Sequence, residues 1–152
     1  MKYFLVGVGG ALGSVLRFWV SSYIAGRVES RFPYGTFVVN MSGSFLIGLV
    51  LAVLADTMDW GANWRYLISI GFIGGYTTFS AFEYETFRLF QSGRVFTAFL
   101  NVALSVVVGF FAVWAGWSAG GAIAKARGRV SSGEVFVSQS ANEVAVCVAE
   151  EP

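Results

Sequence analysis

The stretch Gly74-Gly75-Tyr76-Thr77-Thr78-Phe79-Ser80 lies within residues 66–82, a run without any charged side chain. Glycine costs about 1 kcal/mol relative to alanine in a helix interior, so two glycines followed by hydroxyl residues predict an interrupted helix. Inside a bilayer, backbone groups freed by such an interruption must be satisfied by protein, water or ions. A membrane helix broken at mid-depth therefore indicates a binding site or an ion path.

The composition predicts a membrane protein independently of that stretch. The 152 residues are 56% hydrophobic and 12% charged, with a mean hydropathy of +0.67, whereas soluble domains are roughly 25% charged. A helix needs about 20 apolar residues to cross the bilayer core. Four runs satisfy this requirement: Tyr3–Ala25, Thr36–Ala55, Tyr66–Phe82 and Val95–Ala124. We therefore expect an all-α membrane protein with four transmembrane helices, the third of them broken at mid-membrane.

The C-terminal part of the chain differs in character. Residues 126–152 contain Arg127, Arg129, four glutamates and alternating valines. Such a segment is too short to bury a core of its own. We therefore expect one four-helix transmembrane domain over residues 1–125, followed by a loosely ordered tail over residues 126–152.

The basic residues barely select an orientation in the membrane. The positive-inside rule compares Lys and Arg in the loops on the two sides. The side with both termini carries Lys2, Arg65, Lys125, Arg127 and Arg129, and the other carries Arg27, Arg31, Arg88 and Arg94. Either subtler signals select one orientation, or the chain inserts both ways and functions as an antiparallel pair. Because four short helices enclose little volume, we expect an oligomer.

Two stripes of polar residues run along predicted helices. A spacing of four keeps residues close to one helix face. The second run contains Thr36, Asn40, Ser44 and Gly48, and the fourth contains Thr97, Asn101, Ser105 and Gly109. Each stripe alone is compatible with hydrogen bonding between helices. Together with a broken helix, the two stripes favour a polar track through the membrane.

The first run contains a close-packing motif and a charge. Gly9 and Gly13 have the G-x-x-x-G spacing that lets membrane helices approach closely. Arg17 is a charge within a membrane span, which costs at least about 2.5 kcal/mol at the bilayer centre. The Arg17 side chain either extends to the nearer surface or supplies a fixed positive charge that draws anions into a vestibule.

Phe79 and Phe82 follow the predicted break three residues apart, on one face of a resumed helix. A phenyl ring has a negative face and a positive edge. Ring edges that point at a narrow path favour an anion, whereas ring faces favour a cation, and simple packing is a third interpretation. Glu83 and Glu85 come next, but a spacing of two places them on different faces.

The sequence argues against an enzyme and against nucleic-acid binding. Catalysis would require a nucleophile with a base or two convergent carboxylates, and the chain has no histidine and a single cysteine, Cys147. The basic residues form no patch. A proton-coupled multidrug exporter of similar size is an alternative. Exporters of that type have a glutamate in the first helix, whereas the only charge in the first run of this chain is Arg17. A membrane scaffold without transport is a further alternative.

Taken together, these residues resemble the Fluc (CrcB) family of fluoride channels. The matching segments are Gly9-Gly10-Ala11-Leu12-Gly13 with Arg17, then Gly35-Thr36 with Asn40 and Gly43, and then the long motif from Gly71 to Phe82 with Glu85. The resemblance covers about residues 1–125. It implies a fluoride-selective channel in the inner membrane that exports fluoride passively and protects the cell from fluoride toxicity.

The resemblance also implies an assembly and a set of site residues. It implies an antiparallel, dual-topology homodimer with two pores and a central sodium ion, bound by backbone carbonyls of Gly74 and Thr77. Arg17 is expected to supply a vestibule charge. The expected fluoride pathway comprises Thr36, Asn40, Thr78, Phe79, Ser80, Phe82, Glu85, Asn101 and Ser105. Ala81, Asn101 and Gly109 depart from residues that are frequent in the family, which leaves open the hydroxyl track along the fourth helix.

Overall fold

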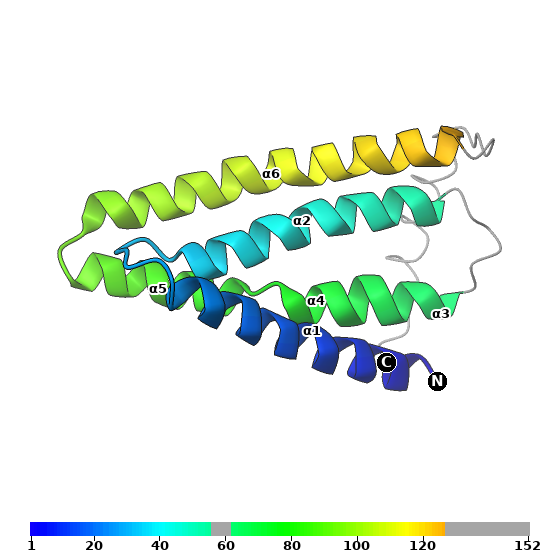
Figure 1. The fold of residues 1–152 in the computed structure, drawn as a ribbon, viewed down its shortest axis with the longest axis horizontal. Coiled ribbons are helices and arrows are strands. Elements are labelled where there is room, and N and C mark those ends of the chain that lie inside the picture. The colour runs from blue at the N-terminus through cyan, green and yellow to red at the C-terminus, as the bar shows by residue number, and fades with distance from the viewer. Residues whose placement is uncertain (56–61, 127–152) are drawn as a thin grey trace, which may run out of the picture.

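The computed structural model describes residues 1–55 and 62–126, and every regular element in that part of the chain is helical (Figure 1). The predicted tail falls almost entirely outside the described residues. In chain order the elements are α1 (Lys2–Ala25), α2 (Tyr34–Ala55), α3 (Ala62–Trp64), the π-helix η1 (Arg65–Ile73), α4 (Gly74–Tyr76), α5 (Phe79–Gln91) and α6 (Val95–Ala126).

Three of these helices are long and apolar enough to cross a membrane. They are α1, α2 and α6, and in their most apolar stretches only 11%, 22% and 17% of the residues are buried inside the protein. Extensive exposed apolar surface of this kind contacts lipid or another protein chain. The prediction of an all-helical membrane protein is thus confirmed. The run 66–82, which we expected as a span, is divided among η1, α4 and the start of α5.

The helices form two closely packed pairs. In Figure 1, α2 lies along α6, while α1 crosses the segment formed by η1 and α4. Glycines permit the close contact between α2 and α6, because a Cβ at Gly48 would overlap the Val113 carbonyl and one at Gly116 would overlap the Phe45 carbonyl. This is the small-residue packing expected between membrane helices.

The pair formed by α1 and η1 is built in the same way, and the predicted role of Gly9 and Gly13 is confirmed. A Cβ at Gly9 would overlap the Leu67 carbonyl, and one at Gly13 would overlap the Phe72 carbonyl. Leu67 and Phe72 are five residues apart, which is the hydrogen-bond spacing of a π-helix. The wide turns of η1 therefore place the carbonyls of Leu67 and Phe72 on one face of the helix. There they pack against Gly9 and Gly13 of α1.

The helical path is interrupted after Tyr76. Thr77 has φ −78° and ψ 157°, and Thr78 has φ −148° and ψ 121°, so both residues are extended. Thr78 then caps α5, because its side-chain oxygen accepts a hydrogen bond from the Ala81 N–H at 3.3 Å. Threonine is a favoured cap, since its hydroxyl satisfies an N–H group that has no partner within the helix.

A short turn brings α5 back along α6. Gly93 has φ +75°, a left-handed conformation that glycine adopts without steric cost. The Arg94 N–H bonds the Leu89 carbonyl at 2.9 Å across this turn. As a result, α5 packs mainly against α6 (Figure 1).

Candidate functional site: a helix break beneath a basic cavity

The break at Thr77 and Thr78 is held open by a side chain of α2. The Asn40 Nδ2 donates to the Thr78 carbonyl at 2.9 Å, and the Thr78 N–H donates to the Asn40 Oδ1 at 2.8 Å. The amide thus pairs with the backbone as a neighbouring strand would, and both polar groups of Thr78 that the break frees gain a partner. Asn40, predicted as a pathway residue, lies directly at the break.

The last turn before the break is held from α1. The Gly75 carbonyl accepts hydrogen bonds from the Ser14 Oγ and from the Arg17 Nε, each at 3.3 Å. A Cβ at Gly75 would lie 2.5 Å from the Gly10 carbonyl oxygen, so α1 and α4 are in backbone contact here. Arg17 is therefore tied to the break itself, and it is half-buried.

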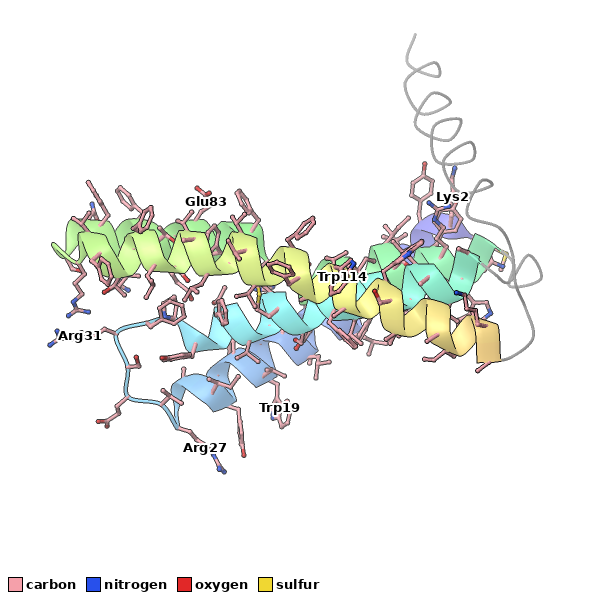
Figure 2. All side chains as sticks on the ribbon, turned by 90° about the horizontal axis from the view of Figure 1, so that it is seen from above. Lys2, Trp19, Arg27, Arg31, Glu83 and Trp114 are labelled. Atoms are coloured by element: carbon pink, nitrogen blue, oxygen red, sulfur yellow. The ribbon has the colours of Figure 1, made fainter. Side chains whose placement is uncertain are left out.

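A cavity of about 390 Å³ opens above the break. Its wall includes the end of α1, the connection to α2, the start of α2, and three residues at or after the break. Two arginines, Arg17 and Arg31, and one carboxylate, Glu85, lie among the lining residues. Figure 2 shows Arg27 and Arg31 on this connection, away from the end of the molecule where Lys2 lies. Arg17, predicted as a vestibule charge, is thus one of the residues that line a cavity.

The floor of this cavity contains a pair of polar side chains from two helices. Thr36 on α2 is buried, and its Oγ1 donates to the Glu85 Oε1 on α5 at 2.7 Å. The second carboxyl oxygen, Oε2, is buried and has no hydrogen-bond partner among the described residues. Thr36, Thr78 and Glu85, three of the predicted pathway residues, all line the cavity. Glu83 is exposed on another face, as its spacing predicted.

The two phenylalanines after the break lie next to each other but in different surroundings. Their ring centroids are 5.8 Å apart with an interplanar angle of 41°, so the predicted shared face is confirmed. Phe79 is 73% exposed and Phe82 only 9%. A second cavity, of about 410 Å³, lies between α5 and α6 and is lined by Phe82 but not by Phe79.

Asn101, predicted in the pathway, is found in the contact between α5 and α6. It is only 1% exposed, and its Nδ2 donates to the Thr86 Oγ1 at 2.9 Å. Ser105 is half-buried one turn further along α6, and Ser80 is exposed at the start of α5. The structure therefore brings Thr36, Asn40, Thr78 and Glu85 together, and places Ser80, Asn101 and Ser105 apart from that group.

The carbonyls predicted to hold sodium belong to the same break. Hydrogen bonds around the break end on the carbonyls of Ile73, Gly75 and Thr78. Gly74 is exposed at the surface of the chain. Carbonyl oxygens are ligands of the kind that hard cations bind, and Gly74 and Thr77 each have one beside the break. Within residues 1–55 and 62–126 there is no cluster of His, Cys, Asp and Glu for another kind of metal.

Three polar residues near the break were not anticipated. The hydroxyl groups of Ser42 and Tyr76 are 2.9 Å apart, and Tyr76 is buried. Ser69 on η1 is 7% exposed, and its Oγ has no partner in the described part of the chain. The contact between Ser42 and Tyr76 could not be predicted from the sequence, because the two residues come from different helices.

The fold and this site define a class of protein. It is a small helical membrane protein in which a cavity with two arginines ends on an interrupted helix, an arrangement suited to attracting a small anion into the membrane.

Comparison with known proteins agrees with that class. The chain belongs to the CrcB-like family, because the family model described as "CrcB-like protein, Camphor Resistance (CrcB)" matches residues 4–117. It is 51% identical over 123 residues to the "Fluoride-specific ion channel FluC" of Acidobacterium capsulatum, a match covering 81% of this chain and 98% of the relative. Identity is 45% to the protein of that name from Solibacter usitatus, over 76% of this chain and 95% of the relative. The corresponding Rhodospirillum rubrum protein is 44% identical, over 76% and 92%.

Proposed function

We propose that this protein is a fluoride-selective channel that lets fluoride leave the cytoplasm passively across the inner membrane. One observation carries the proposal: the basic cavity ends on the Thr78 break in a chain that matches nearly the whole length of proteins named fluoride-specific ion channels. The alternative of a proton-coupled exporter finds no support in these relatives.

The chemistry of the site supports an anion that is small and strongly hydrated. Such an ion enters only where hydrogen-bond donors replace its water. Arg17 and Arg31 raise the local anion concentration at the entrance. Beyond the entrance, the Asn40 amide and the Thr78 hydroxyl supply neutral donors, whereas the Thr36 hydroxyl donates to Glu85. An inside-negative potential drives an anion outward by about 2.3 kcal/mol per charge per 100 mV, so export needs no coupling reaction.

In this proposal the pathway runs from the cavity, past the break, to the rings of Phe79 and Phe82. Ser80 lies at the surface of the single chain, beside Phe79, and Ser105 lies on α6. Both join the pathway only where two chains meet. The broken segment formed by η1, α4 and α5 then crosses the membrane as one discontinuous helix, with Thr77 and Thr78 near mid-depth.

The direct test is anion efflux from liposomes that contain the purified protein. We expect rapid fluoride efflux when a potassium ionophore balances the charge, and retention of chloride under the same conditions. Protein-free liposomes serve as the control. Equal release of both anions contradicts the selectivity, and an absence of fluoride release contradicts the channel.

The assembly that we propose is an antiparallel homodimer. Large apolar side chains are exposed on α5 and α6, among them Phe79, Phe87, Phe90 and Phe99, and the five-to-four distribution of basic residues permits insertion both ways. Two or three lysines added between Ala55 and Arg65 fix one orientation, and lysines added between residues 26 and 33 fix the other. We expect each protein alone to be inactive and a mixture of both to conduct fluoride. Full flux from either one alone contradicts the antiparallel arrangement.

We also propose that a sodium ion binds where two copies of the break meet on a two-fold axis. Each chain would contribute the carbonyl oxygens of Gly74 and Thr77, giving four oxygens without a nearby carboxylate, which suits a monovalent ion. Exchange of sodium for a large organic cation is expected to reduce both dimer assembly and fluoride flux. Unchanged assembly and flux after complete exchange would contradict the sodium site.

A further inference from the structure

A hydrogen-bonded chain connects α6 to the backbone of Phe82. The Asn101 Nδ2 donates to the Thr86 Oγ1 at 2.9 Å, and the Thr86 Oγ1 donates to the Phe82 carbonyl oxygen at 2.7 Å. Asn101 is 1% exposed, so its amide is removed from water and depends on protein partners. The three residues thus form a relay from one helix to the other.

The second bond of this relay is common in helices, but the first is not. Serine and threonine often donate to the carbonyl four residues earlier, and Ser118 on α6 does so to the Trp114 carbonyl at 2.9 Å. Thr86 differs because its oxygen also accepts a hydrogen bond from another helix. A hydroxyl has one proton to donate and two lone pairs, so both bonds form at once and each polarises the other.

The position of this relay gives it a consequence for the aromatic pair. α5 is separated from the preceding helix by two extended residues, and it packs mainly on α6. Phe82 is 9% exposed, whereas Phe79 is 73% exposed. Phe82 and Thr86 line the same cavity between α5 and α6. The carbonyl of Phe82 is therefore fixed from α6, and with it the start of its side chain.

We propose that Asn101 and Thr86 are positioning residues for conduction, which hold Phe82 at the orientation that fluoride requires. The inference rests on the proposed fluoride pathway. It assigns Asn101 a role different from that of an ion ligand, because its amide is engaged within the chain. Thr86, which no sequence pattern singled out, becomes part of the conduction machinery through the Phe82 backbone.

The test compares variants that keep or remove the Thr86 hydroxyl. Thr86→Val has nearly the same shape but no hydroxyl, and Thr86→Ser retains it. Asn101→Leu removes the donor from α6. Ser118→Ala is the matched control, because it removes a hydroxyl with the same bond to a carbonyl four residues earlier but without a partner on a second helix. Fluoride efflux, the half-saturating fluoride concentration and the fluoride-to-chloride ratio are measured on equal amounts of reconstituted protein.

We expect Thr86→Val and Asn101→Leu each to lower fluoride efflux about tenfold and to change the half-saturating concentration. Thr86→Ser and Ser118→Ala are expected to remain within about twofold of the unmodified protein. The double variant Thr86→Val/Asn101→Leu should lose little more than either single variant, since both changes break the same relay. The effect should also be absent when Thr86→Val is combined with Phe82→Met, which lacks the ring, but present with Phe79→Met.

Several outcomes overturn the inference. Normal efflux by Thr86→Val shows that the hydroxyl has no role, and equal losses in Thr86→Ser and Thr86→Val show that packing alone matters. A loss in Thr86→Val that persists in full with Phe82→Met shows that the effect does not pass through Phe82. If the unmodified protein conducts fluoride while these variants fail the test, the positioning role is wrong and the channel stands. If the unmodified protein conducts no fluoride, the proposed function itself is wrong.

Discussion

The two halves of the segment 65–91 are built in opposite ways. Before the break, η1 and α4 pack backbone to backbone against α1, through Gly9, Gly13 and Gly75. After the break, α5 carries large side chains, many of them exposed, and contacts α6 through side chains. The first half is fixed by close packing that leaves no room for a Cβ at Gly9, Gly13 or Gly75. The second half is held by a few hydrogen bonds, and it carries the aromatic pair.

This difference separates the part that anchors the break from the part that would meet an ion. Close helix packing is rigid because interiors of this density resist displacement. Groups that select an ion must be held firmly yet exchange water for the ion as it passes. Asn40 stands at the boundary, since it joins α2 to Thr78, the second of the two extended residues. The comparison predicts that changes before the break abolish the fold, whereas changes after it alter conduction.

The largest effect is expected from Gly9→Ala. A Cβ at Gly9 would overlap the Leu67 carbonyl and lie 2.8 Å from the Phe72 nitrogen, so α1 must separate from η1. We expect destabilisation of at least about 3 kcal/mol, at the upper end for overpacking, and little or no folded protein. Gly7→Ala on the same helix is the control, because nothing lies within 4 Å of its added Cβ. Similar yields of folded protein from both variants would show that the α1–η1 contact is less close than described.

Asn40→Leu is expected to have the second largest effect. The substitution leaves both the N–H and the carbonyl of Thr78 without a partner, at a cost of about 1–3 kcal/mol for each group. The protein should still fold, but fluoride efflux should fall by more than tenfold because the geometry of the break is lost. Asn40→Asp retains an acceptor for the Thr78 N–H and loses the donor, so it should be stabler than Asn40→Leu in thermal unfolding. If Asn40→Leu conducts normally, the pairing with Thr78 is not part of the pathway.

Substitutions of Phe79 and Phe82 are expected to have the smallest effects on stability. Their effects on conduction are expected to be larger. Phe79→Ile and Phe82→Ile conserve much of the volume and should cost less than about 1.5 kcal/mol, with Phe79 costing least because it is exposed. Both should lower fluoride efflux at least severalfold while size-exclusion chromatography shows an unchanged oligomer. Normal efflux by both variants would assign the rings to packing.

Local chemistry made the break predictable from the sequence. Gly74, Gly75 and the hydroxyl residues after them disfavour a continuous helix wherever they occur, and the structure has extended residues at Thr77 and Thr78. The glycine spacing in α1 likewise predicted a close helix contact. The π-helical form of η1 was not predictable, because it depends on how its carbonyls meet α1, and no spacing within residues 65–73 encodes that.

The sequence singled out several residues that the structure brings close together, but it did not predict their contacts. Arg17, Thr36, Thr78 and Glu85 line one cavity, and Asn40 is hydrogen-bonded to the Thr78 backbone beside it. Their pairing could not be deduced, since Thr36 and Glu85 come from different helices and are 49 residues apart. Asn101 lies on the predicted polar stripe of α6, yet its side chain bonds Thr86. A stripe specifies a helix face and leaves open what that face meets.

The central claim is passive, selective conduction of fluoride, and the most direct test is the reversal potential of the reconstituted protein under a fluoride gradient. For a channel selective for a monovalent anion, the reversal potential shifts by about 59 mV for each tenfold change in the gradient. We expect this shift for fluoride, with no further change when a pH gradient is imposed or when chloride is varied. A reversal potential that moves with the pH gradient would identify proton coupling, and one that follows chloride would contradict selectivity.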